Sequence, residues 1–305
     1  MNIKKGSVIA VIVTYNRLPY LQKVIDAVRH QTISIHTILV VNNGSTDGTK
    51  EWLESQKDLS VINQKNVGGS GGFYTGIKNA QNINCEWLWC MDDDVYPKKD
   101  CLERLLKWDN EQVGILCPQR IMNDELFVTE VTKLNLVNPL KKLHAKKIIP
   151  SMIQDKPIEI EGMVFEGPLI KKTVVNNIGY PEKDLFLFYD DTDYSYRATL
   201  AGYKVLYVPG AILDKEYFYN HMSQIDQVKK GKWKLKYHLR NTVFFCKKYG
   251  KNKVFQYFGA SQLYLKMLIA ISKNLFVNDK YNFSDFILLG KMFKQGWQGK
   301  LGKIE

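Results

Sequence analysis

Three consecutive aspartates, Asp92, Asp93 and Asp94, follow an apolar segment at residues 87–91. On an extended backbone, side chains separated by one intervening residue lie on the same side, so the carboxylates of Asp92 and Asp94 can approach one cation together. Oxygen ligands suit Mg²⁺ or Mn²⁺, and such a cation binds phosphate oxygens and neutralises their charge. An acidic turn that caps the next helix is the alternative interpretation. The position of the triplet at the end of a predicted strand favours the metal site.

A glycine-rich segment at residues 66–73 contains Asn66, Gly68 and Gly69. Glycines let a backbone approach a ligand closely, and the N-terminus of a helix favours anions. The spacing differs from the G-x-G-x-x-G pattern of dinucleotide sites. A flexible turn is therefore the alternative to a donor-binding loop.

A second pair of carboxylates, Asp190 and Asp191, follows the aromatic run at residues 186–189 and opens a predicted helix. Burial among aromatic side chains can raise the pKa of a carboxyl group and suit it to general-base catalysis. The alternative is a structural role, in which the acidic residues cap the helix or pair with Arg197. That alternative applies to Asp193 and also to Asp190.

The first hundred residues alternate between strand and helix patterns. The predicted strands cover residues 8–13, 37–41, 60–63 and 87–91, with amphipathic helices between them. This order predicts a parallel sheet with right-handed crossovers, and such sheets bind ligands beyond the carboxyl ends of their strands. Asn16, Asn43, Asn66 and Asp92 all fall at those ends.

The rest of the chain divides into two regions of different character. Residues 123–160 are rich in lysine and weakly periodic, which predicts a loop or hairpin. A helix at residues 190–200 and a strand at residues 204–208 follow. Beyond residue 217 the sequence becomes basic, aromatic and helical, so we expect a boundary there.

Five motifs occur together in one order: residues 11–17, residues 42–49, the glycine-rich segment, the aspartate triplet and residues 189–197. This combination resembles the GT-A-fold family 2 glycosyltransferases, particularly the bacterial galactofuranosyltransferase and rhamnosyltransferase branch. The resemblance covers about residues 7–216 and continues weakly into residues 237–241. It implies an α/β fold with a Rossmann-like, mixed, mostly parallel sheet flanked by helices and a C-terminal helical extension. The implied domains are a catalytic domain at 1–216, with a nucleotide-sugar half at about 1–118 and an acceptor half at about 119–216, and a helical region at 217–305.

The resemblance also implies roles for individual residues. The donor site would be lined by Thr14, Asn16, Arg17, Asn43, Asn66, Gly68, Gly69 and Asp93. Asp92 and Asp94 would hold Mn²⁺ or Mg²⁺ on the diphosphate, and Asp191 would be the catalytic base with Asp190 as its acidic neighbour.

Two positions depart from the pattern of the family. Many relatives have aspartate where Asn43 stands. The family branch also tends to place a metal-binding histidine soon after the strand that follows the base helix. In this chain Asp214 is in or beside that place, with His221 as the fallback.

The implied reaction is a single displacement that inverts the anomeric carbon, with a nucleotide-sugar donor and a lipid-linked or polysaccharide acceptor. UDP-galactofuranose is the preferred donor, whereas dTDP-rhamnose and other UDP-hexoses stay open. A nucleotidyltransferase is the rival from another enzyme class. A degenerate transferase that only assembles at a membrane is the non-enzymatic rival, and the intact Asp92, Asp94 and Asp191 argue against it.

The composition bears on where the protein acts. The chain has 43 Lys and Arg against 31 Asp and Glu, a formal net charge of +12. Basic residues interleaved with aromatic residues from Lys229 onward suit an anionic membrane surface, and no nucleic-acid motif accompanies them. The five cysteines lack metal-site or redox spacing, which indicates a reducing compartment. We therefore expect a cytoplasmic protein, peripheral on the inner face of the cell membrane, with the oligomeric state open.

Overall fold

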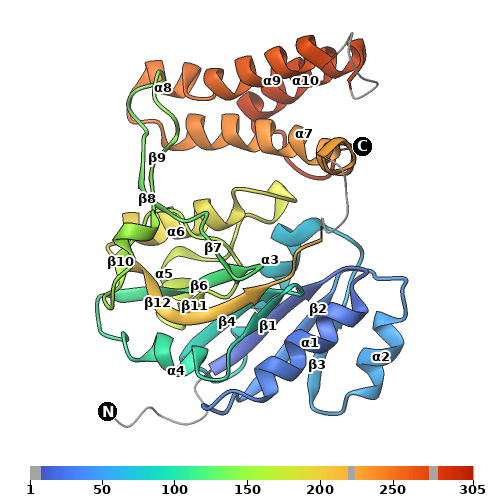
Figure 1. The fold of residues 1–305 in the computed structure, drawn as a ribbon, viewed down its shortest axis with the longest axis vertical. Coiled ribbons are helices and arrows are strands. Elements are labelled where there is room, and N and C mark those ends of the chain that lie inside the picture. The colour runs from blue at the N-terminus through green and yellow to red at the C-terminus, as the bar shows by residue number, and fades with distance from the viewer. Residues whose placement is uncertain (1–7, 219–223, 275–280, 305) are drawn as a thin grey trace. The chain divides into compact units, whose positions relative to one another are not determined.

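The computed structural model describes residues 8–218, 224–274 and 281–304 (Figure 1). The chain forms two compact units. The first comprises Met1–Lys133, Lys146–Lys183 and Asp191–Tyr217, and the second comprises Leu134–Ala145, Asp184–Asp190 and Phe218–Glu305. Leu134–Ala145 and Asp184–Asp190 therefore group with the C-terminal residues, so the two units are not separated by a single boundary near residue 217.

The first unit is built on a ten-stranded sheet with the order β10-β12-β6-β11-β4-β1-β2-β3, in which β5 also pairs with β12 and β7 with β6. Its strands are β1 (Val8–Thr14), β2 (Thr37–Asn42), β3 (Leu59–Asn63), β4 (Trp87–Asp92), β5 (Val95–Pro97), β6 (Val113–Met122), β7 (Glu125–Phe127), β10 (Ile158–Glu159), β11 (Leu169–Lys171) and β12 (Lys204–Lys215). Strands β8 (Val131–Leu134) and β9 (His144–Lys147) form a separate two-stranded sheet.

The four strands predicted in the first hundred residues are all present, and they are parallel. Strand β1 pairs with β2 and β4, and β2 pairs with β3. The longest pairing, between β6 and β12, is also parallel, whereas β11 runs antiparallel between β4 and β6. The prediction of a mixed, mostly parallel sheet flanked by helices is confirmed.

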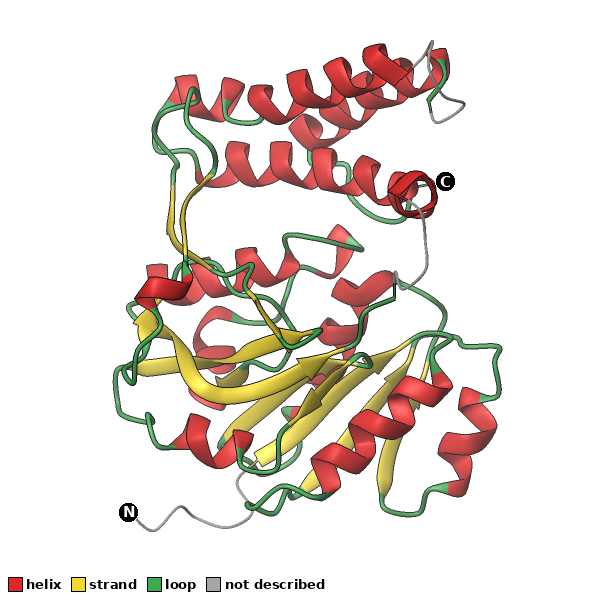
Figure 2. Cartoon of the chain, viewed as in Figure 1, coloured by secondary structure: helices red, strands yellow, loops and turns green. Residues whose placement is uncertain are grey.

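Helices cover both faces of the sheet (Figure 2). Successive side chains of β1 point to opposite faces, and each face packs into its own hydrophobic core. One core joins β1 to helices α1 (Leu18–Arg29), α2 (Thr49–Ser55) and α4 (Cys101–Leu106). The other joins it to α3 (Gly68–Ala80), α5 (Lys172–Ile178) and α6 (Asp190–Leu200). The carboxyl ends of β1, β2 and β4 therefore meet at one edge between two helical layers.

The glycine-rich segment is the first part of α3 rather than a turn before it. A Cβ atom on Gly72 would lie 2.4 Å from Val13, and one on Gly76 would lie 2.4 Å from Val11. These glycines let α3 pack directly on β1, which no larger residue permits. A Cβ atom on Gly69 meets nothing within 4 Å.

The second unit is helical (Figure 2). It contains α7 (Gln224–Tyr249), α8 (Lys253–Phe258), α9 (Ser261–Asn274) and α10 (Phe283–Gln298). The capping box formed by Asn282 and Asp285 starts α10, which packs on α7 and α9. Within the described residues, none of the helices combines the length and the apolar character that crossing a bilayer requires.

Candidate active site

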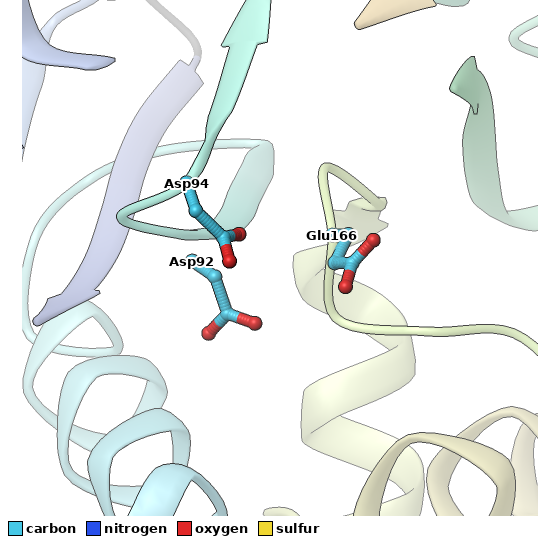
Figure 3. A group of neighbouring side chains, drawn as sticks. All are labelled: Asp92, Asp94 and Glu166. Atoms are coloured by element: carbon cyan, nitrogen blue, oxygen red, sulfur yellow. The ribbon is translucent and has the colours of Figure 1, made fainter. Parts of the chain in front are cut away.

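Three carboxylates gather at the carboxyl end of β4. Oxygen atoms of Asp92, Asp94 and Glu166 all lie within 4.8 Å of one another. Figure 3 shows the side chains of Asp92 and Asp94 next to one another and Glu166 on a loop that faces them. Three oxygen donors at this separation suit a hard cation such as Mg²⁺ or Mn²⁺.

The middle aspartate has a different environment. Asp93 is buried and accepts hydrogen bonds from the hydroxyl of Thr14 at 2.7 Å and the backbone N–H of Tyr15 at 3.2 Å. Arg17 donates to Asp93 at 3.0 Å and to Asp94 at 2.9 Å. Asp93 thus ties the end of β4 to the end of β1. The neighbouring carboxylates raise the pKa of Arg17 against the opposing effect of its burial.

Two cations hold Glu166 in the acidic group. Arg120, which is 1% exposed, donates to Glu166 through Nη1 and to both oxygens of Glu130 through Nη2 at 2.9 Å. Lys215 donates to Glu166 at 2.9 Å and to Asp94 at 3.2 Å. Burial alone would raise the pKa of Glu166, but Arg120 and Lys215 outweigh it and lower that pKa to about 2.

The charges in the site do not balance. The site contains five carboxylates, those of Asp92, Asp93, Asp94, Glu130 and Glu166, and the cations in contact with them among the described residues are Arg17, Arg120 and Lys215. The excess is two negative charges when all groups are ionised, which equals the charge of one divalent cation. Burial raises the pKa of Asp92 well above its usual value, and the charges of Asp94 and Glu166 raise it further. A bound cation would remove this electrostatic cost.

The asparagines expected at the donor site form hydrogen bonds within the protein. Asn43 is buried, donates to the carbonyl of Gly68 at 2.9 Å and accepts from Gln64 at 2.7 Å. Asn66 accepts from the N–H of Gly68 at 2.9 Å. These contacts connect the end of β2 with the start of α3. The roles of Asn43, Asn66 and Gly68 in donor binding stay predictions.

Asn16 lies in an exposed turn with a positive φ of 52°. Its side-chain oxygen accepts from the N–H of Thr46 at 2.7 Å, and its own N–H donates to Ser45 at 2.9 Å. Asn16 therefore joins the loops that follow β1 and β2. This arrangement explains why both motifs are rich in asparagine, serine and threonine.

Asp214, predicted as the third metal ligand, does not lie in the acidic group. It forms an ion pair with Lys98, whereas its neighbour Lys215 contacts Asp94 and Glu166. Alternation along β12 places these adjacent side chains on opposite sides. The fallback ligand, His221, lies outside the described residues.

Asp190 and Asp191 are the first two residues of α6. One oxygen of Asp191 accepts from the backbone N–H of Thr192 at 2.6 Å and from its hydroxyl at 3.3 Å. Asp193 is buried and binds Nε of Arg197 at 2.9 Å, which confirms the structural alternative for that residue. Asp191 is half-buried and distinct from this ion pair.

The backbone before Asp190 is strained. Phe186, Phe188 and Tyr189 have φ values of 66°, 67° and 70°. Non-glycine residues in the left-handed region cost of order 1–3 kcal/mol each and persist where surrounding contacts impose them. Such strain concentrates at functional sites, which supports a special role for the start of α6.

The sequence patterns do not single out Glu166, Lys215 or Arg120. Glu166 is a single carboxylate in the otherwise apolar segment at residues 162–170, and that contrast was the available signal. Lys215 is next to the residue that was chosen. Arg120 is a lone charge at the end of the predominantly apolar β6.

The family model for glycosyl transferase family 2 matches residues 9–166, more than half of the chain. Galactofuranosyltransferase GlfT1 of Mycolicibacterium smegmatis is 25% identical over 206 residues, which cover 64% of this chain and 66% of that protein. Galactofuranosyltransferase GlfT2 of Mycobacterium tuberculosis is 24% identical over 234 residues, 68% of this chain and 34% of that protein. The chain thus matches just under two thirds of the first relative's length and about one third of the second's.

Solved structures show the same fold. The mannosyltransferase PcManGT from Pyrobaculum calidifontis, in complex with GDP-Man and Mn²⁺, has a TM-score of 0.53 and 16% identity, covering 97% of this chain and 87% of that chain. GalNAc-T7 with UDP, GalNAc and Mn²⁺ has a TM-score of 0.63 and 14% identity, covering 96% and 56%. At these identities the likeness concerns the fold, which is GT-A. The chain therefore belongs to glycosyl transferase family 2 and has the GT-A fold.

Proposed function

We propose that this glycosyltransferase moves galactofuranose from UDP-galactofuranose to a hydroxyl group of a lipid-linked or polysaccharide acceptor, with inversion at the anomeric carbon. The observation that carries the proposal is the acidic group of Asp92, Asp94 and Glu166 with its excess negative charge. It is the feature a nucleotide-sugar site needs in order to hold a diphosphate through a cation.

Asp92, Asp94 and Glu166 would hold Mn²⁺ or Mg²⁺, whose role when bound is to neutralise the departing diphosphate. Two similar folds were solved with Mn²⁺, which supports this ion class. Lys215 and Arg17 lie beside the same carboxylates. Both can turn toward phosphate oxygens once a cation offsets the carboxylate charge.

Asp191 acts as the general base. Its carboxylate takes the proton from the acceptor hydroxyl as the acceptor oxygen attacks the anomeric carbon from the side opposite the diphosphate. The bond between the anomeric carbon and the diphosphate oxygen breaks, and the nucleoside diphosphate leaves. The hydrogen bonds from the backbone N–H and the hydroxyl of Thr192 orient the carboxylate of Asp191.

The sugar assignment rests on the relatives named galactofuranosyltransferases. dTDP-rhamnose or another UDP-hexose is the alternative donor, and nucleotidyl transfer is the alternative reaction. Incubation with a panel of these nucleotide sugars, Mn²⁺ and a lipid-linked saccharide separates all of them. The proposal expects UDP release with UDP-galactofuranose and an inverted glycosidic bond by NMR. Pyrophosphate release or a retained configuration would reject it.

We also propose that the second unit binds an anionic membrane surface through α9 and α10. Leu265 and Ile269 on α9, and Phe283 and Ile287 on α10, are each more than half exposed. Each pair is spaced by four residues and so lies on one side of its helix. The exposed lysines of these helices, Lys266, Lys273, Lys291 and Lys294, complement anionic headgroups. Exposed apolar side chains next to lysines are typical of interfacial helices.

Flotation with phosphatidylglycerol and phosphatidylcholine vesicles tests the surface. The variant Ile269→Ser/Ile287→Ser is expected to lose vesicle binding while its transfer to a soluble acceptor is kept. Leu140→Ser, at a side chain that is 84% exposed elsewhere in the unit, is the matched control and should bind normally. Equal binding by all three proteins would reject α9 and α10 as the membrane surface.

A further inference from the structure

The strained loop before α6 is held by one segment of α7, residues 240–242. The side-chain amide of Asn241 lies 3.0 Å from the carbonyl of Leu185, 2.8 Å from that of Leu187 and 3.0 Å from that of Phe188. Asn241 is completely buried. One amide therefore serves three carbonyls, one at the end of the 3-10 helix η2 (Lys183–Leu185) and two in the loop that follows it.

Arg240 fixes the orientation of that amide. Its Nε donates to the side-chain oxygen of Asn241 at 2.9 Å, and its Nη2 donates to the carbonyl of Leu185 at 3.0 Å. Nη1 donates to the carbonyl of Gly302 at 2.6 Å. Because its oxygen accepts from Arg240, the Asn241 amide must present its N–H groups to the loop.

The end of the loop has a third contact. The hydroxyl of Thr242 donates to the hydroxyl of Tyr189 at 2.9 Å, and the Phe186 ring stacks on Tyr237 at 4.9 Å. All of these groups belong to the second compact unit. Each residue from 185 to 189 is therefore held by α7, through its carbonyl, its hydroxyl or its ring. These contacts explain how three non-glycine residues keep the left-handed conformation.

Phe188 is informative because its side chain is only partly packed, with an edge-on contact to the His238 ring at a centroid distance of 5.6 Å. Its side chain is 37% exposed, yet its φ is 67°. Glycine would adopt this conformation without strain, whereas a β-branched residue would be an outlier there. The conformation of Phe188 is thus imposed through its carbonyl, which the Asn241 amide binds.

We propose that Asn241, oriented by Arg240, is a positioning residue that fixes the direction in which α6 begins and so the placement of Asp191. The loop ends at Tyr189 and the helix begins at Asp190, so the last loop dihedral angles set the orientation of the first helical turn. The inference rests on the proposed role of Asp191 as the base. It assigns no contact between Asn241 and any substrate.

The first experiment changes the loop conformation and leaves the amide in place. Phe188→Val disfavours the left-handed conformation, and Phe188→Gly permits it. We expect Phe188→Val to reduce kcat for sugar transfer roughly 10- to 100-fold, the scale of loss when a reacting group is misplaced by about 1 Å. Phe188→Gly should be at least about 10-fold more active than Phe188→Val, with the KM for the donor similar in both. Equal losses in the two variants would overturn the inference, because they would trace the effect to the missing ring.

The second experiment removes the donors. Asn241→Asp keeps the size of the side chain but carries no N–H group, so kcat should fall on the same scale while the donor KM stays within about twofold. Hydrogen exchange of the amides at residues 186–190 should become faster. Gln262→Ala removes another amide-to-carbonyl bond of the same unit, 3.1 Å to Pro139, and should leave kcat unchanged. A normal kcat in Asn241→Asp despite faster exchange would show that the loop does not position the base.

A last comparison separates this inference from the proposed function. If Asp191→Asn keeps full turnover, the base assignment itself fails. If Asp191→Asn is inactive while Asn241→Asp and Phe188→Val are both normal, only the positioning role is rejected. If Asn241→Asp does not fold, the Phe188 pair still decides the result, because its exposed side chain can be replaced at little cost in packing.

Discussion

The ion pair between Arg120 and Glu130 offers a quantitative test of how the acidic site is supported. Both side chains are 1% exposed, and Arg120 also contacts Glu166. Arg120→Met keeps much of the volume but leaves Glu130 as a buried charge without its cation. Breaking a buried pair from one side costs about 3–5 kcal/mol of unfolding free energy. For a domain of this size that corresponds to a decrease in Tm of roughly 6–20 °C.

Circular dichroism during heating, with urea titration at one temperature, measures the loss. Arg104→Met is the matched control, because the ion pair of Arg104 with Asp100 at 2.6 Å is exposed and should contribute less than about 1 kcal/mol. The double variant Arg120→Met/Glu130→Leu removes both charges and should recover part of the stability. A double variant as unstable as Arg120→Met, or a single variant as stable as Arg104→Met, would refute the view that burial of this pair determines the cost.

Three further predictions concern the metal, the glycines and the thiols. Glu166→Gln should weaken Mn²⁺ binding, measured by electron paramagnetic resonance, at least roughly 10-fold. Asp214→Asn should leave the Mn²⁺ titration unchanged. Weaker Mn²⁺ binding by Asp214→Asn, with normal binding by Glu166→Gln, would make Asp214 the ligand instead. Gly72→Ala should destabilise the fold by roughly 1–3 kcal/mol in urea denaturation because its Cβ meets Val13, while Gly69→Ala should be tolerated, and equal effects would contradict the packing argument. Burial raises the pKa of all five cysteine thiols, but Cys85 is only half-buried and the other four are fully buried. Ellman's reagent should therefore modify Cys85 first and the rest only on unfolding; rapid modification of all five in the native protein would disprove this.

The parallel half of the fold was predictable because its information is local. Strands β1 to β4 follow one another with single helices between them, and β1, β2 and β4 are predominantly apolar and buried, whereas β3 is short and half-buried. The position of Asp92 and Asp94 at the end of β4 follows from the same pattern.

The third carboxylate was not predictable because it depends on a distant pairing. Glu166 reaches Asp92 and Asp94 only because β11 inserts between β4 and β6 in the antiparallel direction. The prediction of Asp214 as a metal ligand did not take account of a local irregularity in β12. The register of β12 against β6 shifts between Val208 and Ile212. Counting alternate side chains from the start of β12 therefore does not predict which side of the sheet the later side chains face.

The residues at 186–189 show a different limit. An aromatic run predicts burial, and Phe186 and Tyr189 are indeed buried. Its left-handed backbone follows from contacts with residues 240–242, more than 50 positions later in the chain. Local propensity opposes that conformation, so no pattern within the run could indicate it.

The insertion of β11 has a consequence for the chain as it is synthesised. Strands β1 to β4 can pair as soon as they have emerged, but one edge of β4 then stays unpaired until β11 arrives. That edge is a fully apolar stretch, the kind of surface through which nascent chains aggregate. The same pairing that covers the edge also brings Glu166 to the two aspartates. A nascent chain therefore has an open apolar edge for as long as its ion-binding group is incomplete, and the pairing of β11 with β4 ends both conditions.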